Sequence, residues 1–83
     1  MCGCCGILHF HDRFRSSLQY FHEIDKIRSL VSRGDMAADS ESVPLSSVTA
    51  GARGYIRHEL RCTQCGQRFA VWLDEDGGGL KAI

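Results

Sequence analysis

Two runs of alternating side chains, joined by a Cys-x-x-Cys-Gly sequence, constrain the fold of this chain more than any other feature. In the first run, residues 55–62, one face would carry Ile56, His58, Leu60 and Cys62, and the other face Tyr55, Arg57, Glu59 and Arg61. In the second, Phe69, Val71 and Leu73 alternate with Ala70 and Trp72. Alternation of period two with aromatic and branched residues is typical of half-buried strands. The sequence therefore predicts two antiparallel strands joined by a turn at residues 62–66.

The turn itself has the pattern of half a zinc site. Two cysteines separated by two residues, with a glycine that allows a tight turn, commonly supply two ligands of tetrahedral zinc. The start of the chain repeats this spacing, so we expect a structural zinc site built from four thiolates: Cys2, Cys5, Cys62 and Cys65. Candidate substitute ligands are Cys4, His9 and His11. Three alternatives stay open: an N-terminal cluster of free thiols, a cysteine pair that only shapes the turn, and histidines that are simply solvated.

The region before the hairpin contains one clear helical pattern, at residues 13–33. Its apolar stripe consists of Phe14, Leu18, Tyr20, Phe21, Ile24, Ile27, Leu30 and Val31. This spacing predicts an amphipathic helix with one buried side. Asp12 is the expected N-cap and Gly34 the expected stop.

The segments around this helix are less regular. Residues 7–11 could form a short strand with Leu8 and Phe10 facing inward, and residues 80–83 a last short strand. Residues 35–52 are rich in Ser, Ala and Gly, so we expect a loop with at most an extended piece at 43–48, where Pro44 excludes a central strand. The predicted fold is α+β: one long amphipathic helix packed on a small antiparallel sheet with a zinc-ribbon-like cysteine hairpin.

Length and composition limit the class of protein. We expect the 83 residues to form a single small domain, divided into a Cys/His-rich start (1–12), the helix (13–33), an acidic loop (35–52) and the hairpin with its Gly-rich end (53–83). The formal net charge of zero argues against a dedicated nucleic-acid binder. The start has no signal-peptide pattern and no apolar run could span a membrane, so a cytoplasmic protein with reduced thiols is expected.

The residue inventory contains none of the common catalytic patterns. We find no glycine-rich phosphate loop, no serine-centred elbow and no His-Glu-x-x-His. The carboxylates of Asp74, Glu75 and Asp76 are adjacent, so their side chains should diverge along an extended chain. A redox role for the cysteine pair would need a strand-helix-strand setting around it. We therefore expect no enzymatic activity.

Residues 54–74, followed by Gly77, Gly78 and Gly79, carry a Gly-Tyr-x-x-His-x-Leu-x-Cys-x-x-Cys-Gly pattern with a Gly-rich end. This pattern resembles small bacterial immunity proteins of polymorphic or contact-dependent toxin systems, which also have a helical first half. The resemblance implies a protein that binds and neutralises a cognate toxin, without catalysis.

Two charged sets are candidates for the partner surface. An acidic set would face a basic toxin; its members are Asp39, Glu41, Asp74, Glu75 and Asp76. A basic set would face an acidic one; its members are Tyr55, Arg57 and Arg61. The alternative function is a zinc-ribbon-like protein that binds nucleic acid, or a transcription or translation assembly, through the basic set and Arg68. The sequence leaves the partner, the interface and the oligomeric state open.

Overall fold

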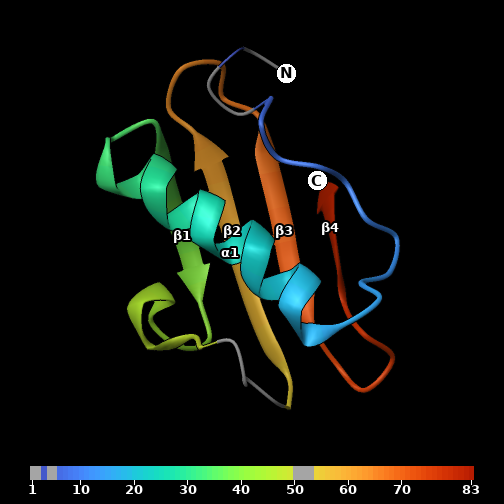
Figure 1. The fold of residues 1–83 in the computed structure, drawn as a ribbon. Coiled ribbons are helices and arrows are strands. Elements are labelled where there is room, and N and C mark those ends of the chain that lie inside the picture. The colour runs from blue at the N-terminus through green and yellow to red at the C-terminus, as the bar shows by residue number, and fades with distance from the viewer. Residues whose placement is uncertain (1–2, 4–5, 50–53) are drawn as a thin grey trace.

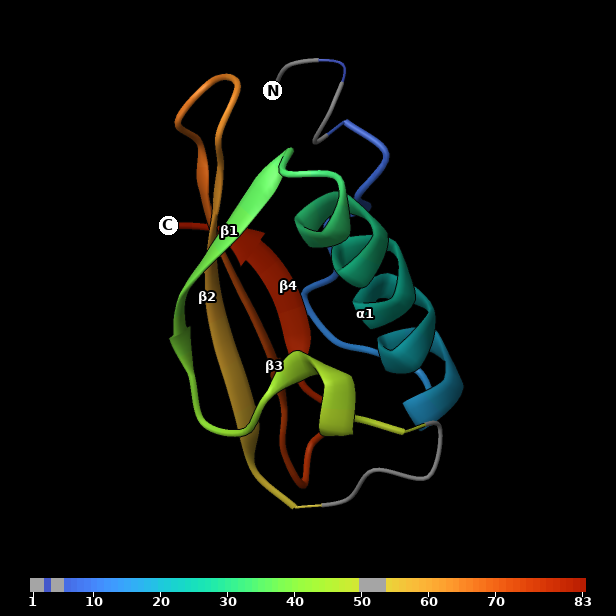
Figure 2. The same ribbon diagram turned by 90° about the vertical axis from the view of Figure 1, so that its left-hand side faces the viewer.

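The amphipathic pattern in the first half of the chain forms a helix that lies across one face of a sheet (Figure 1). The computed structural model describes residues 3, 6–49 and 54–83. Its elements are, in chain order, α1 (Ser17–Ser32), β1 (Met36–Glu41), the 3₁₀ turn η1 (Leu45–Ser47), β2 (Ile56–Cys62), β3 (Arg68–Leu73) and β4 (Gly79–Ala82). The four strands are antiparallel and follow the order β1-β2-β3-β4. Figure 2 shows the two layers from the side, and the predicted α+β class is confirmed.

The helix begins later than its apolar pattern predicted. The backbone of Ser16 is extended, and its side-chain oxygen accepts a hydrogen bond from the N–H of Gln19 at 3.3 Å. Ser16, not Asp12, is therefore the N-cap, because a serine in this geometry satisfies a donor that the first helical turn leaves open. Phe14 is buried as expected, but it lies before the helix. At the other end Gly34 has a φ of +81°, and the helix stops there as predicted.

The buried side of α1 is narrower than the predicted stripe. Tyr20, Ile24, Ile27 and Leu30 are buried against the sheet. Leu18, in contrast, is 66% exposed, so it belongs to the part of the apolar stripe that the sheet does not cover. A helix that packs on one flat sheet buries only the residues nearest to the sheet, and the flanks of a wide apolar stripe remain partly exposed.

The predicted hairpin is confirmed as β2 and β3. Ile56 lies opposite Leu73 at its open end. At the turn, the N–H of Cys62 donates to the carbonyl of Gln67 at 2.8 Å, and the N–H of Gly66 donates to the carbonyl of Cys62 at 2.9 Å. The hairpin is part of a four-stranded sheet under a helix, so the zinc-ribbon-like architecture expected for it is not supported.

The prediction of a loop over residues 35–52 was wrong for its first part, which forms the edge strand β1. Met36 is buried and lies opposite Cys62. The register shifts after Ala38, where Asp39 forms the extra residue of a bulge. Few β-branched or aromatic residues lie in this segment, so local preference does not indicate a strand. The strand exists because β2 offers it an open edge for hydrogen bonds.

The rest of that segment is fastened to the helix. Val43, Leu45 and Val48 turn toward the core. The guanidinium of Arg28 donates to the carbonyls of Leu45 and Val48. A charged donor on two backbone acceptors fastens η1 to α1. Figure 2 shows the η1 turn next to the helix. Residues 50–52 of the predicted loop lie outside the described residues.

The segment before the helix is not the predicted strand. It makes one antiparallel bridge, between His11 and Leu80 of β4, with both N–H···O distances 2.9 Å. Leu8 is buried as expected, but Phe10 is 48% exposed, and its ring centroid lies 5.9 Å from that of Phe69. The last strand predicted at residues 80–83 is confirmed as β4. No helix among the described residues is long and apolar enough to cross a membrane.

Candidate functional site

The face of the sheet opposite α1 is open and carries most of its charge. Alternation along the strands sends every second side chain away from the helix. We call this surface the outer face, and its members are Asp39, Arg57, Glu59, Arg61, Arg68, Ala70, Trp72 and Lys81. Four of these side chains are basic and two are acidic, so the outer face has an excess of positive charge although the whole chain is neutral.

Ion pairs connect the arginines across three strands. The carboxylate of Asp39 lies 3.7 Å from Nε of Arg61 and 4.0 Å from Nε of Arg68. The carboxylate of Glu59 lies 3.3 Å from Nη2 of Arg68 and 3.7 Å from Nε of Arg57. All of these side chains are partly exposed, so each pair contributes less than about 1 kcal/mol to stability. Their main effect is to hold the arginine side chains close to the outer face.

Trp72 forms the centre of the other half of the outer face. It lies opposite Arg57 on β2 and opposite Gly79 on β4. A Cβ at Gly79 would lie 2.9 Å from an atom of the indole ring, so the glycine lets the ring lie close over β4. The ammonium of Lys81 stands 5.5 Å from the centroid of the ring, within the range of a cation–π contact.

The structure places the arginines of the predicted basic set on one surface and adds further residues to that surface. Arg57 and Arg61 lie on the outer face with Arg68, and Tyr55 is 66% exposed directly before β2. Sequence reasoning did not single out Trp72 and Lys81 as part of this site. The period-two pattern of β3 was sufficient to place Trp72 away from the core, whereas Lys81 needed the register of β4.

The acidic candidates, in contrast, are separated. Asp39 is part of the ion-pair layer, and Glu41 ends β1 opposite His58. Asp74, Glu75 and Asp76 lie in the turn between β3 and β4, on the far side of β2 from β1. The acidic residues therefore do not form one surface.

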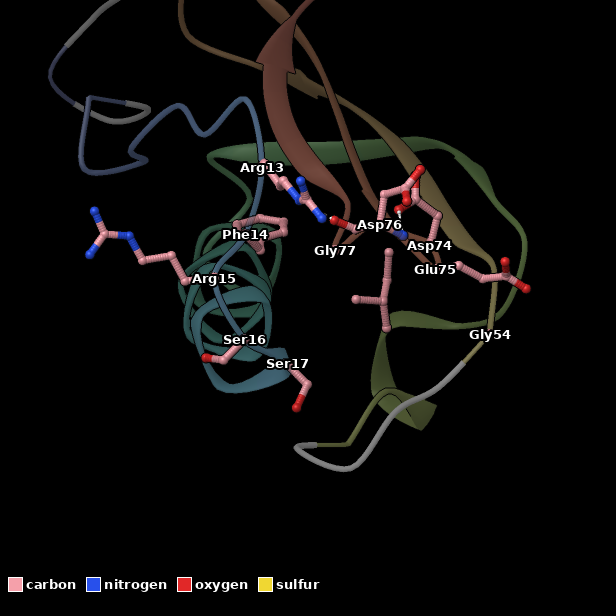
Figure 3. Close-up of a pocket in the computed structure, with 11 residues that line it drawn as sticks. Arg13, Phe14, Arg15, Ser16, Ser17, Gly54, Asp74, Glu75, Asp76 and Gly77 are labelled. Atoms are coloured by element: carbon pink, nitrogen blue, oxygen red, sulfur yellow. Dashed lines mark hydrogen bonds between the residues drawn. The ribbon is translucent and has the colours of Figure 1, made fainter.

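The turn at residues 74–76 borders a cavity of about 670 Å³ beside the start of α1 (Figure 3). One oxygen of Asp74 accepts the N–H groups of Asp76 and Gly78, both at 2.9 Å. Nε of Arg13 donates to the backbone carbonyl of Asp76, and the side chain of Glu75 points away from the cavity. The Asp74 carboxylate thus shapes the turn and does not form an acid–base pair with its neighbours.

The zinc candidates are only partly described. Cys62 is buried on the inner face of the sheet, and Cys65 is exposed in the turn. Among the described residues, no group of three or more His, Cys, Asp or Glu side chains could hold a metal ion. Cys2, Cys4 and Cys5 lie outside the described residues. Zinc binding stays a prediction.

His58 and Tyr20 bring polar atoms into the core. His58 is fully buried, and its Nε2 donates to the carbonyl of Val43 at 2.7 Å, because a carbonyl can only accept. His58 therefore fastens residue 43 to β2. Among the described residues, Nδ1 of His58 and the hydroxyl of Tyr20 have no hydrogen-bond partner. Burial raises the pKa of Tyr20 to about 12, and the positive charge of Arg28 partly opposes this shift.

Known proteins add no family to these observations. No family model, curated protein or solved structure matches the chain. Among the surfaces described above, the outer face combines the largest set of arginines with an aromatic ring, and it is the candidate functional site.

Proposed function

We propose that this chain is a non-enzymatic protein-binding module that holds an acidic surface of its partner on the outer face. The observation that carries the proposal is the gathering of three arginines and a tryptophan on one open face: Arg57, Arg61, Arg68 and Trp72. Arginine and tryptophan are among the residues that most often dominate the binding free energy of protein interfaces.

The geometry supports a partner with negative charge. The arginine side chains are already ordered by Asp39 and Glu59, so less side-chain entropy is lost when a partner's carboxylates bind them. The net positive charge of the outer face would increase the rate of encounter with an acidic surface. The two longest dimensions of the molecule are 32 and 23 Å, and a standard interface buries about 800 Å² on each partner. An interface of this size would cover most of one face.

Together with the resemblance of residues 54–79 to immunity proteins, this surface leads us to propose a bacterial toxin domain as the partner. The protein would neutralise the toxin by covering its active site, which requires only a complementary surface. His58 and Leu60 of the resembling pattern are buried. We therefore assign these two residues to the fold, and we assign Arg57 and Arg61, which flank them along the same strand, to binding.

A second candidate, single-stranded nucleic acid, is favoured by one observation. Trp72 is partly buried and lies between Arg57 and Lys81. The accessible part of such a ring can stack on a base while the neighbouring cations contact phosphates. The neutral charge of the whole chain is unfavourable for this function. We therefore rank the protein partner first.

The two candidates are separated by a matched pair of charge reversals. Arg61→Glu removes the ion pair of Arg61 with Asp39 on the outer face, while the new carboxylate would lie opposite Arg68. An exposed ion pair contributes less than about 1 kcal/mol to stability, so the sheet should still fold. Arg15→Glu makes the same change of charge on an exposed arginine that is not part of the outer face. Melting temperatures of the wild type and both variants establish that all three are folded.

Affinity capture with the tagged wild-type protein from the source cells should identify a protein, which is then purified and titrated by calorimetry. We expect Arg61→Glu to weaken its binding at least tenfold, about 1.4 kcal/mol, and Arg15→Glu to leave it within a factor of two. Equal affinity of Arg61→Glu and wild type for that protein would disprove the proposal. Salt-sensitive anisotropy of a labelled oligothymidylate that Arg61→Glu abolishes, with no protein captured, would establish the second candidate instead.

A further inference from the structure

Two adjoining hollows lie along the flank of α1 on which η1 packs. The first has a volume of about 300 Å³ and an almost entirely apolar wall, and its lining residues are Arg28, Val31, Ser32, Leu45 and Ser46. The second has a volume of about 530 Å³, and its lining residues are Arg28, Ser29, Ser32 and Arg33. Arg28 and Ser32 belong to both hollows, so the two form one continuous surface, which we call the α1–η1 groove.

The apolar part of the groove is a place where the packing between α1 and η1 reaches the surface. Leu45 is buried, Val31 is partly buried, and both belong to the core or pack directly against it. Ser32 and Ser46 border them with short exposed side chains, which leave the hollow open. The hollow therefore offers a site for an apolar side chain of another molecule, and its burial is favourable because apolar surface leaves water.

Arg28, at the junction of the two hollows, carries a positive charge that the fold does not neutralise. Its Nε and Nη2 atoms donate to the carbonyls of Leu45 and Val48, and these acceptors are uncharged. Among the described residues, no carboxylate lies within 4 Å of its guanidinium, and its Nη1 atom has no hydrogen-bond acceptor. Arg28 is partly buried, so its charge is screened less than that of a fully exposed arginine.

The acidic residues nearest to the groove leave its charge positive. Nε of Arg33 lies 3.3 Å from the carboxylate of Asp35, but both side chains are partly exposed and the pair is weak. Asp25 lies one turn before Arg28 on α1, and neither acid lines the groove. The lining contains two arginines and no acidic or histidine side chain, and arginine stays protonated in proteins. The charge of the groove therefore does not depend on any titration near neutral pH.

We propose that the α1–η1 groove is a docking site for an extended acidic segment of a protein, in which one leucine side chain fills the apolar part. Neighbouring carboxylates of that segment bind Arg28 and Arg33, because a guanidinium offers paired N–H donors to a carboxylate. The apolar part favours such a segment over a purely polar polyanion. The open shape favours it over a small free molecule, since small-molecule sites enclose most of their ligand. The groove lies on the helix side of the sheet, so it is independent of the outer face.

Two matched peptides test the site on the full chain: capped Glu-Asp-Leu-Glu-Asp and capped Glu-Asp-Ser-Glu-Asp. Each is titrated at pH 7.5 while the amide shifts of Val31, Ser32 and Ser46 are followed by two-dimensional NMR. We expect saturable shift changes with the leucine peptide and at least fivefold weaker binding of the serine peptide. Arg61→Glu, which changes only the outer face, should bind the leucine peptide at the groove within a factor of two of wild type, and this result separates the two surfaces.

Two pairs of variants at exposed positions locate the contacts without removing Arg28, which also fastens η1. Ser32→Glu places a carboxylate at the junction of the two hollows, and we expect at least fivefold weaker binding of the leucine peptide; Ser17→Glu, at the start of the same helix, is its control. Arg33→Gln should weaken binding at least threefold, and Arg15→Gln, which removes a positive charge outside the groove, is its control. Melting temperatures establish that all four variants are folded, and both controls should bind as wild type does.

Three results would overturn the proposal. The first is equal affinity of the leucine and serine peptides, because the groove would then only attract negative charge. The second is wild-type affinity of both Ser32→Glu and Arg33→Gln. The third is the absence of a saturable shift at Val31, Ser32 and Ser46.

Discussion

Replacing Tyr20 with phenylalanine should make the protein more stable, although it removes a polar group from a large buried side chain. Tyr20 is 0% exposed on the inner side of α1, and its ring meets that of Phe14 edge-on with centroids 5.6 Å apart. Among the described residues, its hydroxyl has no hydrogen-bond partner. Phenylalanine keeps the ring and its contacts and removes only the oxygen.

The expected gain follows from the burial of that oxygen. A buried hydroxyl without a hydrogen bond costs about 1–3 kcal/mol relative to its hydrated state in the unfolded chain. We expect the free energy of unfolding to rise by about 1 kcal/mol in Tyr20→Phe. For a domain of this length, such a change corresponds to an increase of about 4–8 °C in melting temperature.

The same hydroxyl predicts a loss of stability in alkaline solution. The pKa of Tyr20 is raised by burial from 10.0 in the unfolded chain to about 12 in the folded protein. A raised folded-state pKa contributes stability that is fully present below pH 10 and disappears as the pH rises through about 12, because the unfolded state ionises first. One pKa unit corresponds to 1.36 kcal/mol, so the total loss is about 3 kcal/mol.

Urea unfolding of the wild type, Tyr20→Phe and Tyr55→Phe tests both parts of this reasoning. Tyr55 is exposed, so Tyr55→Phe is the control for loss of a hydroxyl at the surface. The unfolding is followed by circular dichroism at pH 7.5 and at intervals from pH 9 to 11.5. Tyr20→Phe should lose much less stability with pH than the other two proteins. A Tyr20→Phe variant that is 1 kcal/mol less stable than wild type at pH 7.5 would refute the reasoning, since the hydroxyl would then have a favourable partner.

Two further predictions concern the turns. Gly78→Ala should lower the free energy of unfolding by at least about 3 kcal/mol, because its Cβ would lie 2.0 Å from the carbonyl oxygen of Trp72. Gly66 has the same φ of +78° but open space around it, so Gly66→Ala should lower that free energy by only about 1–2 kcal/mol, as measured by thermal unfolding. If the cysteines hold zinc, native mass spectrometry of the reduced protein should find one zinc per chain, and Cys65→Ser should melt markedly lower because metal binding stabilises the fold. Cys65 is the better test than Cys62, since Cys62 is also buried in the core. An unchanged melting temperature of Cys65→Ser in zinc-containing buffer would argue against the site.

The sequence predicted the members of the candidate site that lie on one strand, but it did not predict contacts that depend on the register between strands. Alternation along residues 55–62 placed Arg57 and Arg61 together, because neighbouring positions on one side of a strand follow from local geometry alone. The contacts of Asp39 with Arg61 and Arg68 depend on the bulge in β1, and the contact of Lys81 with Trp72 depends on how β4 pairs with β3. Pairing between strands is not encoded in the period of either strand, so these members of the outer face could not be found from the sequence.

The features of the fold also separate into those that follow from local periodicity and those that depend on distant contacts. The sequence by itself determined the β2–β3 hairpin, the side of each strand that faces the core and most of the inner side of α1, since these follow from periods of 2 and 3.6 residues within one segment. Only the tertiary structure decided that residues 36–41 form a strand, that the helix starts after Ser16, and that Phe10 and Leu18 are exposed. These outcomes depend on contacts with distant segments: the open edge of β2, the turn at residues 74–78, and the bridge between His11 and Leu80 of β4. Such contacts offset an unfavourable local preference, which is why a stretch of Ala, Asp, Ser and Glu became an edge strand.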